Sequence, residues 1–412
     1  MLSILPVEIR MWEILPHLDD SARIVLRYVL LEDPIPEILT KEIQKEICKY
    51  SVTYVKFFQS RINYLFICQY ACEHGNIELL KWAIKNKFPM NKWSCFNAAY
   101  HGHLELLKVL RENRCEWNQM TCSGAAENGH LEILKWARAK GCPWDQITCG
   151  NAAKNNHLEL LQWARANGCP WNEMTCSYAA KRGNFELLKW AAENGCPWNE
   201  ETCAYAGSSG NLEILKWLRQ NGCPWSISTN HLAARNGHLD LLKWAYENGC
   251  DVNTDTFNQG VLSGSVEVVK WLRQKNCEWN SLSCVYASME GNLPVLKWLM
   301  EMGYEMYKCT CTYAARGGHL NILKWARENG CDWDEEVCAE AAANGHLEVL
   351  KWLRENGCPW DKTTCCNAYM GENKEVLEWA MKNGCPWDET TYAYAAENGN
   401  LEVLEWEMKN GF

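Results

Sequence analysis

Apolar positions recur with helical spacing in short stretches along the chain. Residues 131–140 place Leu131, Leu134 and other apolar side chains on one side of a helix, with charged residues between them. The preceding stretch, 121–128, reads as a shorter helix with a pair of small residues, and Gly129 follows where a left-handed residue can end a helix. No stretch shows the alternation typical of strands. The pattern predicts helix–turn–helix units and an all-α protein.

This unit recurs with a period of 27 residues and no insertion. One position of the second helix is tryptophan in every unit except at Val109, namely Trp82, Trp136, Trp163, Trp190, Trp217, Trp244, Trp271, Trp298, Trp325, Trp352, Trp379 and Trp406. A fixed period indicates tandem repeats, which bury their apolar faces by stacking. We therefore expect a helical-repeat solenoid of about thirteen units. Because burial of an indole is strongly favourable, we expect these tryptophans to form a core layer rather than an exposed ladder.

The unit resembles the ankyrin repeat. The string A-A-x-x-G-H-L-E-x-L-K at 125–135 is similar to the ankyrin core, Gly249–Asn253 matches the family's repeat ending, and Thr121–Cys122 stands at its helix start. Ankyrin repeats have about 33 residues, so the resemblance implies that their projecting hairpin is trimmed here to a tight turn. It also implies a protein–protein interaction scaffold rather than an enzyme. Such Trp- and Cys-rich arrays are similar to those of giant DNA viruses of amoebae and some protists, which suggests a role in host–virus interaction.

Most of the 24 cysteines occupy two repeated positions, with a C-x6-C spacing inside each unit. A zinc ribbon needs C-x2-C, whereas free cysteine behaves as a small hydrophobe. We expect the cysteines to fill the core, with zinc or disulfide ladders as the alternatives, and we predict no metal site and no cofactor. Cys309 and Cys366 break the pattern and are expected to be exposed.

A histidine precedes the second helix in six units, at His103, His130, His157, His238, His319 and His346. Asn or Ser takes its place elsewhere, and Asn is a poor metal ligand. In the ankyrin family this residue forms a hydrogen bond between adjacent units, so the resemblance implies that role here.

Recognition is expected where the repeats differ. The residue after the Ala–Ala pair and the zone just before Thr–Cys both vary, and in ankyrin proteins the corresponding places line a concave groove. The predicted partner-binding residues are Trp93, Tyr100, Lys154, Lys181, Arg182, Arg235, Met289, Arg316 and Met370. The zone before Thr–Cys adds Met120, Ile147, Met174 and Leu282. The basic members, Lys154, Lys181, Arg182, Arg235 and Arg316, are predicted to form one basic strip, which favours an acidic protein segment. The alternative is a solvated surface that drifts neutrally.

One unit is irregular. Asn230 and Phe257 replace the helical cysteine in successive repeats, and Gly260–Val261 replaces Ala–Ala. These changes indicate either a degenerate repeat with a local bend or a patch specific to one partner.

The N-terminal residues do not follow the period. Residues 1–50 predict a helical module and 51–64 a decayed capping helix, ahead of the repeats at 65–412. The module resembles the start of an F-box, which docks a Skp-family adaptor of a cullin ubiquitin ligase. The residues that carry this resemblance are Leu5, Pro6, Ile9, Ile14, Leu15 and Leu18. The spacing before Ile14 is one residue too long and the usual downstream tryptophan is absent, so a plain helical cap is the alternative.

Composition narrows the function further. The net charge of −10 argues against a nucleic-acid partner. The chain has no apolar run long enough to span a membrane and no signal-like start. We expect a monomer in the cytoplasm, or in the host cytoplasm if the source is viral, with reduced thiols. Two functions remain open: a substrate receptor for a ubiquitin ligase, or a stand-alone scaffold that masks a partner.

Overall fold

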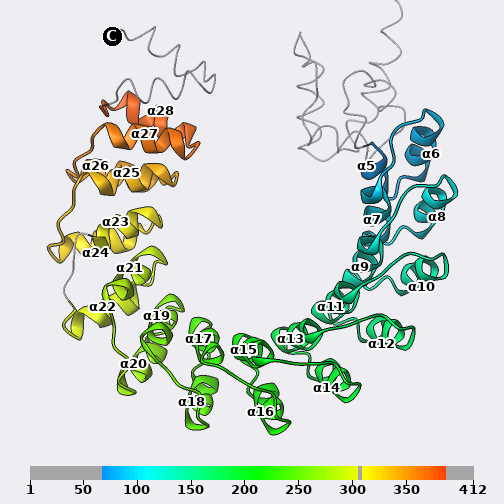
Figure 1. Ribbon diagram of the computed structural model, residues 1–412. Helices are drawn as coiled ribbons and strands as arrows, with labels where there is room; N and C mark the ends of the chain where they lie inside the picture. Colours follow the sequence, from blue (N-terminus) through cyan, green and yellow to red (C-terminus); the bar gives the residue numbers. More distant parts are fainter. Residues whose placement is uncertain (1–66, 305–308, 387–412) are drawn as a thin grey trace, which may run out of the picture. The chain divides into compact units, whose positions relative to one another are not determined.

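The computed structural model describes residues 67–304 and 309–386, and within these residues the secondary structure is helical throughout. The chain divides into two compact units, Met1–Trp198 and Asn199–Phe412. Each repeat is a pair of helices, a first helix with an odd number and a second helix with an even number (Figure 1). The predicted fold class, an all-α helical-repeat solenoid, is confirmed over twelve of these pairs. The predicted modules 1–50 and 51–64 and the final repeat lie outside the described residues.

Nearly all the helices have nine residues. The first unit contains α5 (Ile67–Glu73), α6 (Ile77–Lys85), α7 (Lys92–Tyr100), α8 (Leu104–Glu112), α9 (Gln119–Glu127), α10 (Leu131–Ala139), α11 (Gln146–Lys154), α12 (Leu158–Ala166), α13 (Glu173–Lys181) and α14 (Phe185–Glu193). The second unit contains α15 (Glu200–Ser209), α16 (Leu212–Gln220), α17 (Ser228–Arg235), α18 (Leu239–Glu247), α19 (Thr254–Leu262), α20 (Val266–Gln274), α21 (Ser281–Met289), α22 (Leu293–Glu301), α23 (Cys309–Arg316), α24 (Leu320–Glu328), α25 (Glu335–Ala343), α26 (Leu347–Glu355), α27 (Lys362–Met370) and α28 (Lys374–Lys382).

Within each unit the first helices form one row and the second helices another (Figure 1). Neighbouring first helices contact one another more extensively than neighbouring second helices do. The cause is the small residues of the first helix, because Ala125 and Ala126 of α9 are completely buried and let the next backbone approach.

The connection between repeats is a short turn, as the trimmed-hairpin prediction requires. After α10 ends at Ala139, the chain reaches α11 through a few extended residues. Asp145 then caps α11, since its Oδ1 accepts a hydrogen bond from the Ile147 N–H at 3.1 Å.

A histidine ties each such repeat to the one before it. The His157 Nε2–H donates to the Glu127 carbonyl across the repeat boundary, with 3.2 Å between N and O. Its ring lies over Gly129, which has φ +73°, and a Cβ at that position would sit 2.7 Å from His157 Cε1. Equivalent bonds join His130 to Tyr100, His238 to Ser208, His319 to Met289 and His346 to Arg316. The expected hydrogen bond between adjacent units is confirmed.

Leucine, alanine and cysteine form the core. In α10 the buried residues are Ile133, Leu134 and Ala137. The expectation that the repeated tryptophans form a core layer is wrong for most of them, because only Trp271 and Trp298 among those described are buried and the others are half-buried.

The tryptophans line the seam between second helices instead. Trp117 packs edge to face on Trp136 of the next repeat, with ring centroids 6.0 Å apart. The guanidinium of Arg111 covers Trp117 at 4.1 Å from the ring centroid. This same Arg–Trp–Trp arrangement recurs in other repeats. The indoles therefore pair edge to face between adjacent repeats, a guanidinium covers the face of one indole of each such pair, and both rings stay partly in contact with solvent.

The cysteines fill the core, as predicted. Among the described residues all are free thiols, and all are buried except Cys309 and Cys366. Those two are half-buried rather than exposed, which corrects the expectation for them. Burial raises the pKa of the Cys68 thiol to about 12 and that of Cys284 to about 12.

In the irregular repeats, the residues that replace the helical cysteine are buried and make new contacts in the core. Asn230 is completely buried, and its Nδ2 donates to the carbonyls of Cys250 at 2.8 Å and Asp251 at 3.0 Å. Phe257 is also completely buried and lies 6.5 Å from Trp279 between ring centroids. These two departures from the repeat are core replacements and offer nothing to a partner.

Candidate interaction surface

The variable positions of the repeat lie on the exposed side of the first helices, which we call the first-helix face. In α9 the opposite side is buried through Thr121, Cys122 and the alanine pair. A first helix therefore has one side fixed by stacking and one side free of packing demands. Each of the two units has its own first-helix face.

In the first unit the start of each first helix carries an apolar side chain. Trp93, Met120, Ile147 and Met174 are the second residues of α7, α9, α11 and α13. Trp93 is 43 % exposed, Ile147 50 % and Met174 42 %, while Met120 is half-buried. We call these four residues the apolar ridge. The sequence placed them just before the helices, whereas the structure places them inside the first turn.

An aromatic cluster extends the ridge along α7. Trp93 meets Phe96 edge to face at 5.7 Å between ring centroids, and Phe96 meets Tyr100 at 5.4 Å. Phe96 fits over the next helix because residue 124 is glycine, where a Cβ would lie 2.9 Å from the Phe96 ring. Both predicted residues of α7, Trp93 and Tyr100, thus belong to one cluster. Phe96 joins it, although the variable positions of the sequence did not single it out.

The predicted basic residues of the first unit come together at the other end of its helices. Lys154 ends α11 and Lys181 ends α13, and Arg182 follows directly. Lys154 Nζ lies 3.9 Å from Glu127 Oε1, and Arg182 Nε donates to the Lys154 carbonyl at 3.0 Å. Lys181 and Arg182 are exposed and Lys154 is half-exposed. Lys154 thus pairs with a carboxylate of the preceding repeat, and Arg182 contacts the backbone at the end of α11.

The predicted residues of the second unit are more dispersed. Arg235 donates to Gln259 Oε1 at 3.1 Å, and Arg316 Nε lies 3.6 Å from Glu340 Oε2. Met370 is 62 % exposed, whereas Met289 is half-buried. Arg235 and Arg316 belong to a different unit from Lys154 and Lys181. The residues of the predicted basic strip therefore form two groups, one in each unit.

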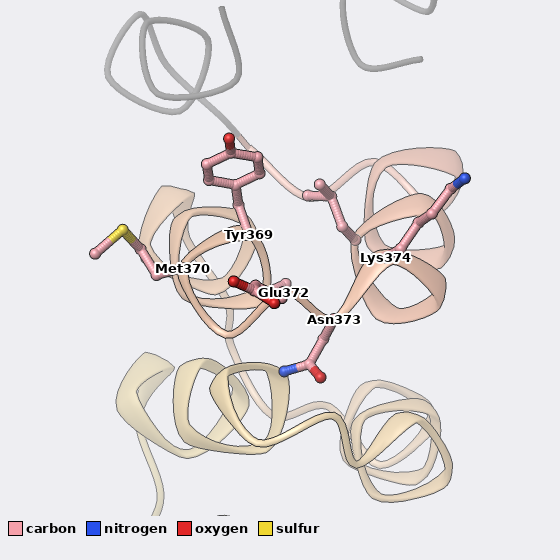
Figure 2. Close-up of a pocket in the computed structure, with 7 residues that line it drawn as sticks. Tyr369, Met370, Glu372, Asn373 and Lys374 are labelled. Carbon is pink, nitrogen blue, oxygen red and sulfur yellow. The ribbon is translucent and has the colours of Figure 1, made fainter. Parts of the chain in front are cut away.

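A pocket opens between α27 and α28. It is lined by Ala368, Tyr369, Met370, Glu372, Asn373, Lys374 and Leu377. Figure 2 shows Tyr369, Met370 and Lys374 around it, while Asn373 points away toward the preceding repeat, where its Nδ2 donates to the Ala343 carbonyl at 2.8 Å. Met370 stands 27 residues after Ala343, at the same place in the repeat. Since Asn373 binds beside Ala343 of the preceding repeat, a following repeat would bind beside Met370 in the same way, and elsewhere in the array the next repeat fills this place. We therefore interpret it as a stacking surface.

Neither a metal site nor a membrane-spanning helix is found among residues 67–304 and 309–386. In these residues, no group of three or more His, Cys, Asp or Glu side chains is arranged to hold a metal ion. In the same part of the chain, no helix has the length and apolar character needed to cross a membrane.

A comparison with models of protein families agrees with this fold. Residues 68–111, 202–246 and 284–327 match the family model described as ankyrin repeats (many copies). One similar solved structure is the crystal structure of the human ASB11 ankyrin repeat domain, at 18 % sequence identity and a TM-score of 0.33, with 38 % of this chain and 84 % of that chain covered. A comparison with curated proteins returned no match. The family-model match supports the predicted ankyrin repeats, and such repeats imply a protein–protein interaction scaffold.

Proposed function

We propose that this chain is an interaction scaffold whose protein partner binds the first-helix face. One observation carries the proposal: the positions that recur in most repeats are used in stacking, while those that vary are exposed or half-buried on the first helices. Ala125, Ala126 and His157 illustrate the first kind, and Ile147 and Lys181 the second. A surface that folding leaves free to vary is available for recognition.

We propose further that residues 1–50 dock a Skp-family adaptor, which makes the chain a substrate receptor of a cullin ubiquitin ligase in the cytoplasm. The support is the sequence pattern that includes Leu5, Pro6 and Ile14. A monomeric scaffold that only masks its partner is the second candidate, and it requires no contribution from these residues.

The first-helix face is tested by charge reversal with a matched control. The variant Lys154→Glu/Lys181→Glu/Arg235→Glu changes the ends of first helices, whereas Lys243→Glu/Lys270→Glu/Lys324→Glu makes the same charge change on second helices. Quantitative affinity capture should show a protein that the unaltered chain and the control retain and the first variant loses. Equal retention by both variants argues against the proposal, provided that both keep the helical circular dichroism signal.

The adaptor is tested by Ile14→Asp/Leu15→Asp in the full chain. We expect this variant to lose Skp and cullin while it keeps the partner of the repeats. Absence of Skp from the unaltered chain contradicts the receptor function and leaves the masking scaffold.

A further inference from the structure

The apolar ridge is not required by the fold. In the second unit, residues that occupy the same place in the 27-residue period are Glu201, Ser228, Asp255, Leu282, Cys309, Glu336 and Thr363. Repeats with these mostly polar residues stack as the others do, through buried alanine, leucine and cysteine. Four successive apolar residues, three of them more than 40 % exposed, therefore contribute little to stacking in the first unit. Exposed apolar side chains at the same place in successive repeats mark a candidate interaction surface.

The residue types suit binding to a protein. Trp93 and Met174 are of the kinds enriched in interface cores, and methionine adapts to different apolar partners. Trp93 is held by its edge-to-face contact with Phe96, so its binding carries a smaller entropic cost. The ridge runs across four successive first helices, α7, α9, α11 and α13, which provides a contact line for an elongated segment rather than a small molecule.

The basic residues near the ridge favour a segment that carries negative charge. On α11 and α13 the ridge residues Ile147 and Met174 lie at one end, and Lys154, Lys181 and Arg182 lie at the other. At 1.5 Å per residue the two ends are about 10 Å apart. The chain as a whole carries a net charge of −10, so this cationic border stands out against an acidic background. A segment with apolar side chains along one edge and carboxylates along the other matches both features.

We infer that the first unit binds an acidic amphipathic segment of another protein, with its apolar edge on the ridge Trp93–Met120–Ile147–Met174 and its carboxylates toward Lys181 and Arg182. This inference rests on the proposed function and makes it specific, because it assigns the partner's chemistry and limits the contact to one unit.

The test begins with random peptides displayed on phage and selected on the full chain. We expect selected sequences to be rich in Asp and Glu together with Leu, Phe, Trp or Met. A synthetic peptide from this pool is then titrated by fluorescence anisotropy. The variant Ile147→Asp/Met174→Asp should weaken binding by about tenfold or more. An aspartate in the first turn suits the helix dipole, so these changes leave the helices intact.

The second unit supplies the matched control. Leu282 has the same place in the period and is 44 % exposed, so Leu282→Asp should change the affinity by no more than about twofold. Lys181→Glu/Arg182→Glu should weaken binding of the acidic peptide, and added salt should weaken it as well. These results together support the inference.

Other results overturn it in distinguishable ways. Enrichment of basic peptides contradicts the assigned partner chemistry. Binding that survives Ile147→Asp/Met174→Asp but is lost with Arg235→Glu/Arg316→Glu removes the ridge and keeps the proposed function. Binding that no change on the first-helix face affects contradicts both.

Discussion

Substitution of alanine for Gly129 should destabilise the array more than the same substitution at Gly141. Both glycines have a left-handed backbone, with φ +73° at Gly129 and +81° at Gly141. An alanine in this conformation costs about 1–2 kcal/mol. A Cβ at Gly141 meets nothing within 4 Å, whereas a Cβ at Gly129 would lie 2.7 Å from His157 Cε1. The His157 ring must then move and lose its bond to the Glu127 carbonyl.

The lost hydrogen bond is worth about 0.5–1.5 kcal/mol. We therefore expect Gly141→Ala to cost about 1–2 kcal/mol and Gly129→Ala about 1.5–3.5 kcal/mol. A long repeat array need not unfold in one step. Hydrogen exchange measured on peptides that cover α9 to α12 is therefore the suitable assay, because it reports the local free energy of opening.

The double variant Gly129→Ala/His157→Ala separates the two contributions. Without the imidazole the new methyl group has space, so the Gly129→Ala change should cost less in a His157→Ala background than in the unaltered chain. Equal costs for Gly129→Ala and Gly141→Ala, or strict additivity of Gly129→Ala and His157→Ala, would refute the claim that the ring packs on this glycine to join adjacent repeats.

Three further predictions concern the histidines, the thiols and the arginine–tryptophan contacts. Burial lowers the pKa of His130 below its usual value near 6.5, so the stability it contributes is present above about pH 6.5 and is lost as the pH falls through its pKa in the folded state. His130→Asn should reduce this acid sensitivity in hydrogen exchange, since Asn373 makes the same kind of bond. Burial raises the pKa of thiols such as Cys68 and Cys284, so the thiols of the native chain should react slowly with a disulfide reagent at neutral pH. The half-buried Cys309 and Cys366 should react first. Rapid reaction of most thiols contradicts their core position. Arg138 covers Trp144 at 4.0 Å and donates to the Cys142 carbonyl. Arg138→Ala should therefore lower the local free energy of opening, measured by hydrogen exchange on peptides of α10 and α11, by about 1–2 kcal/mol, and Arg138→Lys should recover only part of it. A neutral Arg138→Ala contradicts this contact.

The period and the glycine-bounded helices made the fold predictable from the sequence. Each repeat uses the same residues for the same contacts, so the stacking role of Ala125, His157 and the cysteines followed from their recurrence. Recurrence misled on the tryptophans, because a residue can be required at an inter-repeat seam while one edge remains in solvent. Trp136 packs on Trp117, whose ring the Arg111 guanidinium covers, and only the three-dimensional contacts reveal this arrangement.

The candidate site was predictable in part. Variation among repeats identified Lys181, Arg182 and Trp93 as exposed positions. It does not separate the two units, so the sequence predicts one basic strip where the structure has one basic group in each unit. The sequence shows the residues of the apolar ridge only as separate variable positions. Their common place in the first turn of each helix, and the exposure of Ile147 and Met174, come from the structure.

The central claim is that a protein partner covers the first helices, and hydroxyl-radical footprinting tests it most directly. Met174 on α13 is 42 % exposed, and Met302, at the end of the second helix α22, is 48 % exposed, so the two should oxidise similarly in the free chain. With a saturating selected peptide or captured partner, mass spectrometry should show protection of Met174 and Trp93 and unchanged oxidation of Met302. Protection of Met302 with continued oxidation of Met174 and Trp93 would contradict the account.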